Sequence, residues 1–170
     1  DTDEQIRLKV GKPISDIFND HGEGHFRDLE KEAIRDACAS SNVVISTGGG
    51  SVVTSENRIA MAESGFVVCL EASVETIVNR MEKSSKRYPM LDDGDKILNI
   101  ETLKSAREQY YALADLTIHT DDMVPEDVAT EVISAWGRNL SVENRPDPPT
   151  ENNPSFSVET SSRSYPVYVD

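Results

Sequence analysis

Hydrophobic residues along this chain alternate between short continuous runs and longer stretches with helical spacing. The short runs are rich in β-branched residues and are typical of parallel strands covered on both faces; they occupy residues 42–46, 66–70 and 116–119. Apolar residues at helical spacing predict four helices, at residues 26–39, 74–81, 100–113 and 125–136. Ser73 is suited to cap the second of these helices, and Pro125 to begin the fourth.

The order of these elements predicts the fold class. Strands that alternate with helices imply right-handed βαβ crossovers, and hence an α/β fold with a doubly wound parallel sheet and flanking helices. In such sheets the ligand site lies at the carboxyl ends of the strands. The segment Ser46–Gly50 follows the first predicted strand, so we expect it at that edge.

The pattern changes near Asn139, and this change predicts the domain organisation. Residues 1–138 are expected to form one folded domain. Residues 139–162 are polar and rich in proline and predict a disordered linker, because they bury too little apolar surface to offset their ordering entropy. Residues 163–170 become apolar again and are expected to begin a second domain.

Charge and composition narrow the class of partners. A net charge of −14 argues against broad contact with nucleic acid or with an anionic membrane, which would both be repelled. No apolar run approaches the roughly 20 residues of a membrane-spanning helix. Cys38 and Cys69 lack a Cys-x-x-Cys spacing, which favours buried thiols in a reducing compartment. We therefore expect a soluble, cytoplasmic protein, or one of the plastid stroma if the source is eukaryotic.

Two aspartates near the start are the first candidate site residues. Asp1 and Asp3 would point the same way on an extended strand end. Such carboxylates are suited to hold Mg²⁺ through water and to accept a hydroxyl proton. The alternative is a pair of solvated acids.

A charged pair and a glycine run are the next candidates. Arg27 and Glu30 are three residues apart on a predicted helix, so the glutamate can fix the orientation of the Arg27 guanidinium, which is suited to bind a carboxylate. The alternative is an ordinary surface ion pair, which contributes about 0–1 kcal/mol to stability. Gly48, Gly49 and Gly50 allow positive φ angles and a close approach of backbone amides to an anionic or polyhydroxyl ligand. A plain flexible turn explains three consecutive glycines less well.

Basic residues and histidines are the last candidate site residues. The basic segment Lys83–Leu91 has the composition of a mobile lid over phosphates, with Arg87 meeting the transferred group, or of a solvated loop. Arg107 is a possible second clamp or a surface arginine that covers tyrosines. His21 and His25 are weak metal candidates, because glycines at 22 and 24 disfavour a helix that presents both.

Taken in order, these motifs resemble those of the shikimate kinase family, within the nucleoside-monophosphate-kinase-like P-loop group. The resemblance covers Asp1 to about Arg138 and lies in Asp1-Thr2-Asp3, Gly11-x-Pro13-Ile14-x-Asp16-Ile17-Phe18, Gly22-Glu23-x-x-Phe26-Arg27-x-x-Glu30, Ser46–Gly50, Arg87–Leu91 and Arg107–Ile118. The chain departs from the family at Tyr88, where arginine is more usual, and in an Arg107–Asp115 spacing that is one residue short.

The resemblance implies an ATP-dependent kinase that phosphorylates the 3-hydroxyl of shikimate, in chorismate biosynthesis, with Mg²⁺. By that similarity Asp3 holds the shikimate hydroxyls and assists deprotonation, while Asp1 helps to position Mg²⁺. The resemblance further implies that Arg27 and Arg107 bind the substrate carboxylate and that Glu30 orients Arg27. Gly48, Gly49 and Gly50 would line the same pocket. On the nucleotide side, it implies that Arg87 contacts the γ-phosphate and that Arg80 contacts adenine.

Two further expectations concern what lies outside the matched motifs. A Gly-x-x-x-x-Gly-Lys-Ser/Thr phosphate loop is not among these 170 residues, and neither is the family's first strand, so we expect negligible kinase activity and a marginal fold from this stretch alone. The segment Ser162–Val169 resembles the opening strand of 3-dehydroquinate synthase, which implies a fused synthase domain as a partner.

Two other functions remain open from the residues alone. One is a kinase of another small hydroxy acid, such as gluconate. The other is a non-catalytic kinase-like module fused to the synthase.

Overall fold

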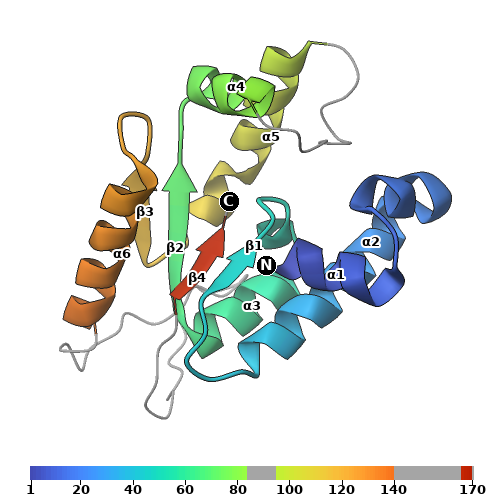
Figure 1. The fold of residues 1–170 in the computed structure, drawn as a ribbon, viewed down its shortest axis with the longest axis horizontal. Coiled ribbons are helices and arrows are strands. Elements are labelled where there is room, and N and C mark those ends of the chain that lie inside the picture. The colour runs from blue at the N-terminus through green and yellow to red at the C-terminus, as the bar shows by residue number, and fades with distance from the viewer. Residues whose placement is uncertain (84–94, 140–165, 170) are drawn as a thin grey trace.

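The computed structural model describes residues 1–83, 95–139 and 166–169. Its elements, in chain order, are α1 (Thr2–Val10), α2 (Ile14–Cys38), β1 (Ile45–Thr47), the 3-10 turn η1 (Ser51–Val53), α3 (Ser55–Ser64), β2 (Phe66–Glu71), α4 (Val74–Lys83), α5 (Lys96–Tyr111), β3 (Leu116–His119), α6 (Pro125–Asn139) and β4 (Pro166–Val169) (Figure 1). Within these residues, no helix combines the length and the apolar content that crossing a membrane requires.

The described strands form one parallel sheet in the order β1-β4-β2-β3. The predicted α/β fold with a parallel sheet is confirmed. Because the strands are parallel, the carboxyl ends of β1 and β2 lie at the same edge, beside α5 and the start of α1 (Figure 1). The final strand β4 pairs with both β1 and β2. The proposed division into a domain, a linker and a second domain stays a prediction, since residues 140–165 lie outside the described part.

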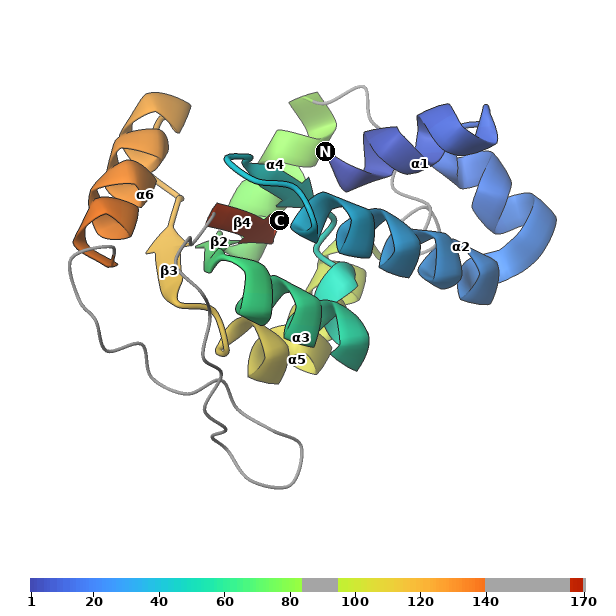
Figure 2. The same cartoon turned by 90° about the horizontal axis from the view of Figure 1, so that it is seen from below.

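Alternation along β2 explains why helices cover both faces of the sheet. Phe66 and Val68 pack with Ile118 of β3 and with Val132 of α6. The intervening Val67 packs on the opposite side, in a cluster built on Ile34 of α2 and Met61 of α3. Figure 2 shows the strands lying between α6 and the pair α2 and α3. Each face therefore has its own apolar core, as the continuous hydrophobic runs predicted.

The chain begins in a helix, so the expectation of an extended strand end at Asp1 and Asp3 is wrong. Asp1 caps α1, and its Oδ1 accepts a hydrogen bond from the Glu4 amide at 3.0 Å. Residues two apart on a helix point about 200° apart, so Asp1 and Asp3 face different directions. The chain carried a signal for this start, because an aspartate followed three residues later by a glutamate is typical of a helix N-terminus.

The second helix begins earlier than predicted. α2 starts at Ile14 rather than near residue 26, and Gly22, with φ 79° and ψ 172°, kinks it. The segment before the kink packs through Ile17 against Ile6 of α1 and Phe26 of α2. The predicted cap is confirmed, because the Ser73 hydroxyl accepts a hydrogen bond from the Thr76 amide at 3.2 Å.

Candidate active site

A cavity of about 1380 Å³ lies at the carboxyl edge of the sheet. Its volume exceeds the roughly 300–1,000 Å³ of a typical single-ligand pocket, so it has room for two small substrates. The sequence-predicted residues that line it are Asp3, Arg27, Glu30, Gly48, Gly49, Gly50, Arg80 and Arg107. They come from α1, α2, the β1–η1 turn, α4 and α5, and the fold thus brings distant motifs together.

Arg27 is held between two carboxylates of its own helix. Its Nη1 lies 3.1 and 2.9 Å from the two oxygens of Glu30, and its Nη2 and Nε lie 2.9 and 3.2 Å from Glu23 Oε1. The Arg27 side chain is 16% exposed and that of Glu30 only 2%. Burial alone lowers the pKa of Arg27, but the two glutamates more than reverse this and raise it. The guanidinium is therefore a fixed, charged group.

Charged groups from three helices act on the buried Glu30 carboxyl. Burial raises the pKa of this carboxyl above its ordinary value, while the charge and hydrogen bonds of Arg27 act in the opposite direction. Asp3 raises this pKa as well, and Arg107 lowers it. Both residues thus act electrostatically on the same buried carboxyl, although they come from α1 and α5.

The glycine run provides space rather than an unusual backbone conformation. Gly50 has φ −83° and ψ −16°, which any residue can adopt. A Cβ added at Gly50 would lie only 2.7 Å from Nη1 of Arg27, and one added at Gly48 would lie 3.6 Å from the carboxylate oxygens of Asp3. The backbone of the turn therefore passes directly against Arg27 and beside Asp3.

Neighbouring helices brace this turn. Tyr111 of α5 donates a hydrogen bond from its hydroxyl to the Gly49 carbonyl at 2.8 Å. From α3, Asn57 and Arg58 donate to the carbonyls of Ser51 and Val52 at 3.0 and 2.7 Å. The sequence analysis did not identify these three residues. Tyr111 lies one helical turn after Arg107, and this spacing could have indicated that it faces the same site. The sequence gives no comparable indication for Asn57 and Arg58.

The carboxyl ends of β2 and β3 form the other side of the cavity. Arg80 of α4 donates to the Thr120 hydroxyl at 2.9 Å and to its carbonyl at 2.5 Å. Beside it, Asp121 accepts the Ser73 amide at 2.9 Å, and the hydroxyls of Ser73 and Thr76 lower the pKa of Asp121 well below its ordinary value. Lys104 of α5, another cavity residue that sequence reasoning missed, donates to the carbonyl of Ala72.

The remaining predicted residues lie elsewhere. Asp1 is exposed and serves as the α1 cap rather than lining the cavity. Arg87 and the lid segment around it lie outside the described residues. The exposed rings of His21 and His25 lie 4.9 Å apart between centroids. Across residues 1–83, 95–139 and 166–169, no cluster of three or more His, Cys, Asp or Glu side chains is arranged to hold a metal ion.

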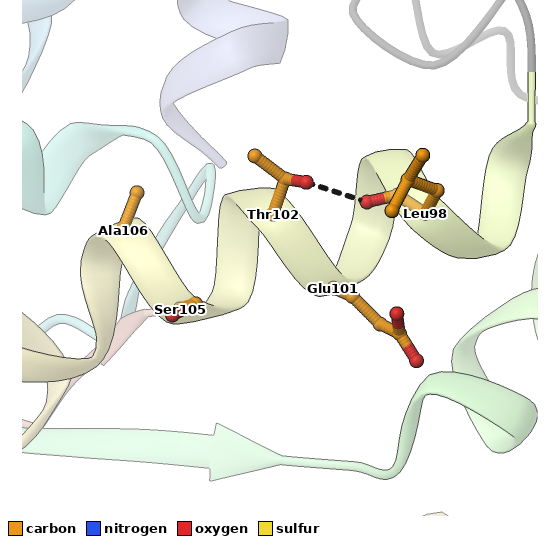
Figure 3. A pocket seen from close by; sticks show the side chains of 5 residues that line it. All are labelled: Leu98, Glu101, Thr102, Ser105 and Ala106. Carbon is orange, nitrogen blue, oxygen red and sulfur yellow. Dashed lines mark hydrogen bonds between the residues drawn. The ribbon is translucent and has the colours of Figure 1, made fainter.

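A second, shallower pocket of about 500 Å³ lies along the outer part of α5 (Figure 3). Its lining is Leu98, Glu101, Thr102, Ser105 and Ala106, and the Thr102 hydroxyl bonds back to the Leu98 carbonyl at 2.7 Å. This lining offers one carboxylate and no cation. The larger cavity, with its clustered arginines, is therefore the better candidate for an anionic ligand.

Comparison with known proteins identifies relatives of this arrangement. The family model described as shikimate kinase matches residues 1–136. The shikimate kinase of Geobacter sulfurreducens is 42% identical over 132 residues, covering 78% of this chain and 72% of the relative, and that of Thermoanaerobacter pseudethanolicus is 39% identical over 138 residues, covering 81% and 80%. Among solved structures, the shikimate kinase of Acinetobacter baumannii in complex with shikimate superposes with a TM-score of 0.77 at 28% identity, over 82% of this chain and 78% of that one. The Aquifex aeolicus shikimate kinase gives a TM-score of 0.67 at 30% identity, over 83% and 80%.

Proposed function

The chain belongs to the shikimate kinase family, and from that premise we propose how its own residues bind shikimate and act on it. As a family member it is a transferase that uses ATP in aromatic amino acid biosynthesis. The observation that carries the proposal is the convergence of Arg27, Asp3 and the glycine turn on one cavity.

The substrate carboxylate is proposed to bind Arg27 and Arg107. A guanidinium donates two parallel hydrogen bonds to a carboxylate, and the glutamates on either side of Arg27 fix its plane before substrate arrives. Binding then costs little further ordering of this side chain. The amides of Gly48–Gly50 are proposed to line the same pocket, with Gly50 directly against the Arg27 guanidinium.

Asp3 is proposed to bind the ring hydroxyls and to act as the base. Its carboxylate lies beside Gly48, in the cavity that holds the arginines. In the transfer, the 3-hydroxyl oxygen forms a bond to the γ-phosphorus while the bond from that phosphorus to the β–γ bridging oxygen breaks. ADP leaves, and the hydroxyl proton passes to Asp3. Most of the rate gain then comes from positioning and charge neutralisation.

The nucleotide side is proposed to involve Arg80 beside adenine and Arg87 at the γ-phosphate. Two bonds to Thr120 already fix the Arg80 guanidinium at the rim of the cavity. The resemblance implies Mg²⁺ held through water near Asp1, but this residue fits the role poorly, because it caps α1, is exposed and lies outside the cavity lining. When bound, Mg²⁺ supplies charge neutralisation for the phosphates.

Two further proposals concern the cell and the chain beyond this domain. A cytoplasmic location is supported by the free thiols of Cys38 and Cys69. A fused synthase domain is supported by the resemblance of residues 162–169 to its opening strand. Sequencing the gene downstream of Asp170 tests the second proposal directly, and an unrelated downstream sequence rejects it.

Substitution of Asp3 tests the proposed base. Asp3→Asn keeps the side-chain shape and removes the proton acceptor, so in the full-length protein shikimate-dependent ADP formation should fall about 10²- to 10⁴-fold. The matched control is Asp28→Asn on α2, an exposed acid paired with Lys31. Calorimetric titration with shikimate, and with gluconate, checks binding separately. An unchanged kcat in Asp3→Asn, or tighter binding of gluconate than of shikimate, contradicts the proposal.

A further inference from the structure

One face of α5 contacts the ends of two different strands. Lys104, Arg107 and Tyr111 are spaced by three and four residues, so they lie on the same side of the helix, and all three line the cavity. Lys104 donates to the Ala72 carbonyl just after β2, and Tyr111 donates to the Gly49 carbonyl just after β1. The proposed carboxylate clamp, Arg107, therefore stands between two anchoring contacts.

These polar contacts matter because α5 buries little apolar surface. Among its 16 residues only Ile100 is buried, while Ile97 and Leu98 are 53% and 59% exposed. Near its C-terminal end, the partly buried rings of Tyr110 and Tyr111 pack on the core cluster around Ile34 and Met61. Apolar packing of this kind holds α5 against the sheet edge, and the polar contacts of Lys104 and Tyr111 add direction to it.

The Tyr111 contact also fixes the glycine turn. A peptide group is planar and trans, so the Gly49 carbonyl and the Gly50 N–H point in opposite directions. Holding that carbonyl toward α5 therefore sets the orientation of the Gly50 amide as well. Gly50 is the residue that lies against Arg27. The Tyr111 hydroxyl thereby connects α5, which carries Arg107, to the glycine turn, which packs on Arg27.

We propose that Tyr111 is a positioning residue, whose bond to the Gly49 carbonyl sets the spacing between Arg107 and the glycine turn and so tunes affinity for the substrate carboxylate. This inference rests on the proposed function and assigns it one further residue. Tyr111 acts here through Arg107 and the Gly49–Gly50 peptide. Lys104 supports it by fixing the same helix at β2.

Tyr111→Phe tests the proposal, because it removes the hydroxyl and keeps the ring. In the full-length protein, loss of one neutral hydrogen bond should raise both the dissociation constant and the KM for shikimate about three- to tenfold, with kcat and the KM for ATP within about twofold of the parent. The matched control is Tyr110→Phe, since the Tyr110 ring packs under Arg58 and does not line the cavity. Its shikimate affinity should equal that of the parent. Equal affinities of Tyr111→Phe and Tyr110→Phe overturn the proposal.

A double-mutant cycle separates positioning from simple stabilisation. In an Arg107→Lys background, Tyr111→Phe should change shikimate affinity less than in the parent, because the clamp that it positions is already impaired. Equal effects in the two backgrounds contradict action through Arg107, whatever the change in Tm. Failure of the proposed function is distinguishable, since the parent and Tyr110→Phe would then both fail to bind shikimate.

Discussion

Gly50→Ala adds one methyl group at the tightest point of the candidate site. The new Cβ would lie 2.7 and 2.8 Å from the two terminal nitrogens of Arg27 and 3.1 Å from its central carbon. The Gly50 backbone angles suit alanine, so the change introduces a clash without backbone strain. Arg27 has little freedom to yield, because it is mostly buried and bonded to Glu23 and Glu30.

The size of the effect follows from the bonds that Arg27 would lose. A displaced guanidinium no longer meets the substrate carboxylate in its two-pronged geometry, and hydrogen bonds to charged groups contribute about 1.5–3 kcal/mol. Since 1.4 kcal/mol is a factor of ten in binding, shikimate affinity should fall about ten- to a hundredfold. Unfolding should also become easier, because the Arg27 to Glu30 bonds are disturbed while Glu30 stays buried.

Calorimetric titration with shikimate measures this loss directly and needs no turnover. Gly48→Ala is the matched control, because its Cβ would lie 3.6 Å from the Asp3 oxygens, an ordinary contact distance, and its effect should be clearly smaller. In an Arg27→Ala background the Gly50→Ala change should have almost no further effect. The reasoning is refuted if Gly50→Ala binds shikimate as tightly as the parent, or if its penalty persists without Arg27.

Two further predictions concern the core. Ile34 is 0% exposed at the contact of α2 with β1 and α3, so Ile34→Ala should lower the free energy of unfolding by about 2–5 kcal/mol, measured by urea unfolding followed by circular dichroism. The control Ile59→Ala, at a position that is 47% exposed, should lower it by less than about 1 kcal/mol. Equal losses in the two variants would contradict this assignment of the core. Burial raises the pKa of the Cys69 thiol to about 11, against about 8.5 when unfolded, so the stability that it contributes is fully present below about pH 8.5 and is lost as pH rises toward 11. Between pH 7.5 and pH 10, the urea midpoint of unfolding should therefore fall further in the parent than in Cys69→Ala. Equal falls in the two proteins would contradict the raised pKa of Cys69.

The hydrophobic pattern was a good guide to the sheet. The runs at 66–70 and 116–119 predicted β2 and β3 closely, because parallel strands covered on both faces must be apolar throughout. The first strand was placed slightly early: β1 is Ile45–Thr47, and Val44, inside the predicted run, is 64% exposed. Sequence alone does not show which end of an apolar run leaves the core.

The start of the chain was predicted less well, for identifiable reasons. Gly22 and Gly24 argued against a helix before Phe26, yet α2 continues through this region with one kinked residue. Packing of Ile17 against α1 supplies stability that local propensity does not reveal. The role of Asp1 was missed for a related reason: it caps α1, and the sequence analysis had predicted an extended segment there instead of a helix.

The site was predictable in its charged residues and not in its supports. Arg27 with Glu30 is a local helix pair, so three-residue spacing was enough to predict it. Tyr111 and Gly49 are 62 residues apart in sequence and meet only because α5 crosses the edge of the sheet. Contacts of this kind depend on tertiary geometry, which no short motif encodes.

The kink of α2 also divides the helix into two segments that both reach the cavity. Gly22 makes the kink with its positive φ, and no packed neighbour from elsewhere in the described chain lies within 4 Å of where its side chain would begin, so the bend is a property of the backbone there. Phe18 lines the cavity from the segment before the kink, and Arg27 lines it from the segment after. A substitution at Phe18 therefore changes the cavity wall before the kink and leaves in place the residues that hold Arg27, Glu23 and Glu30, which lie after it.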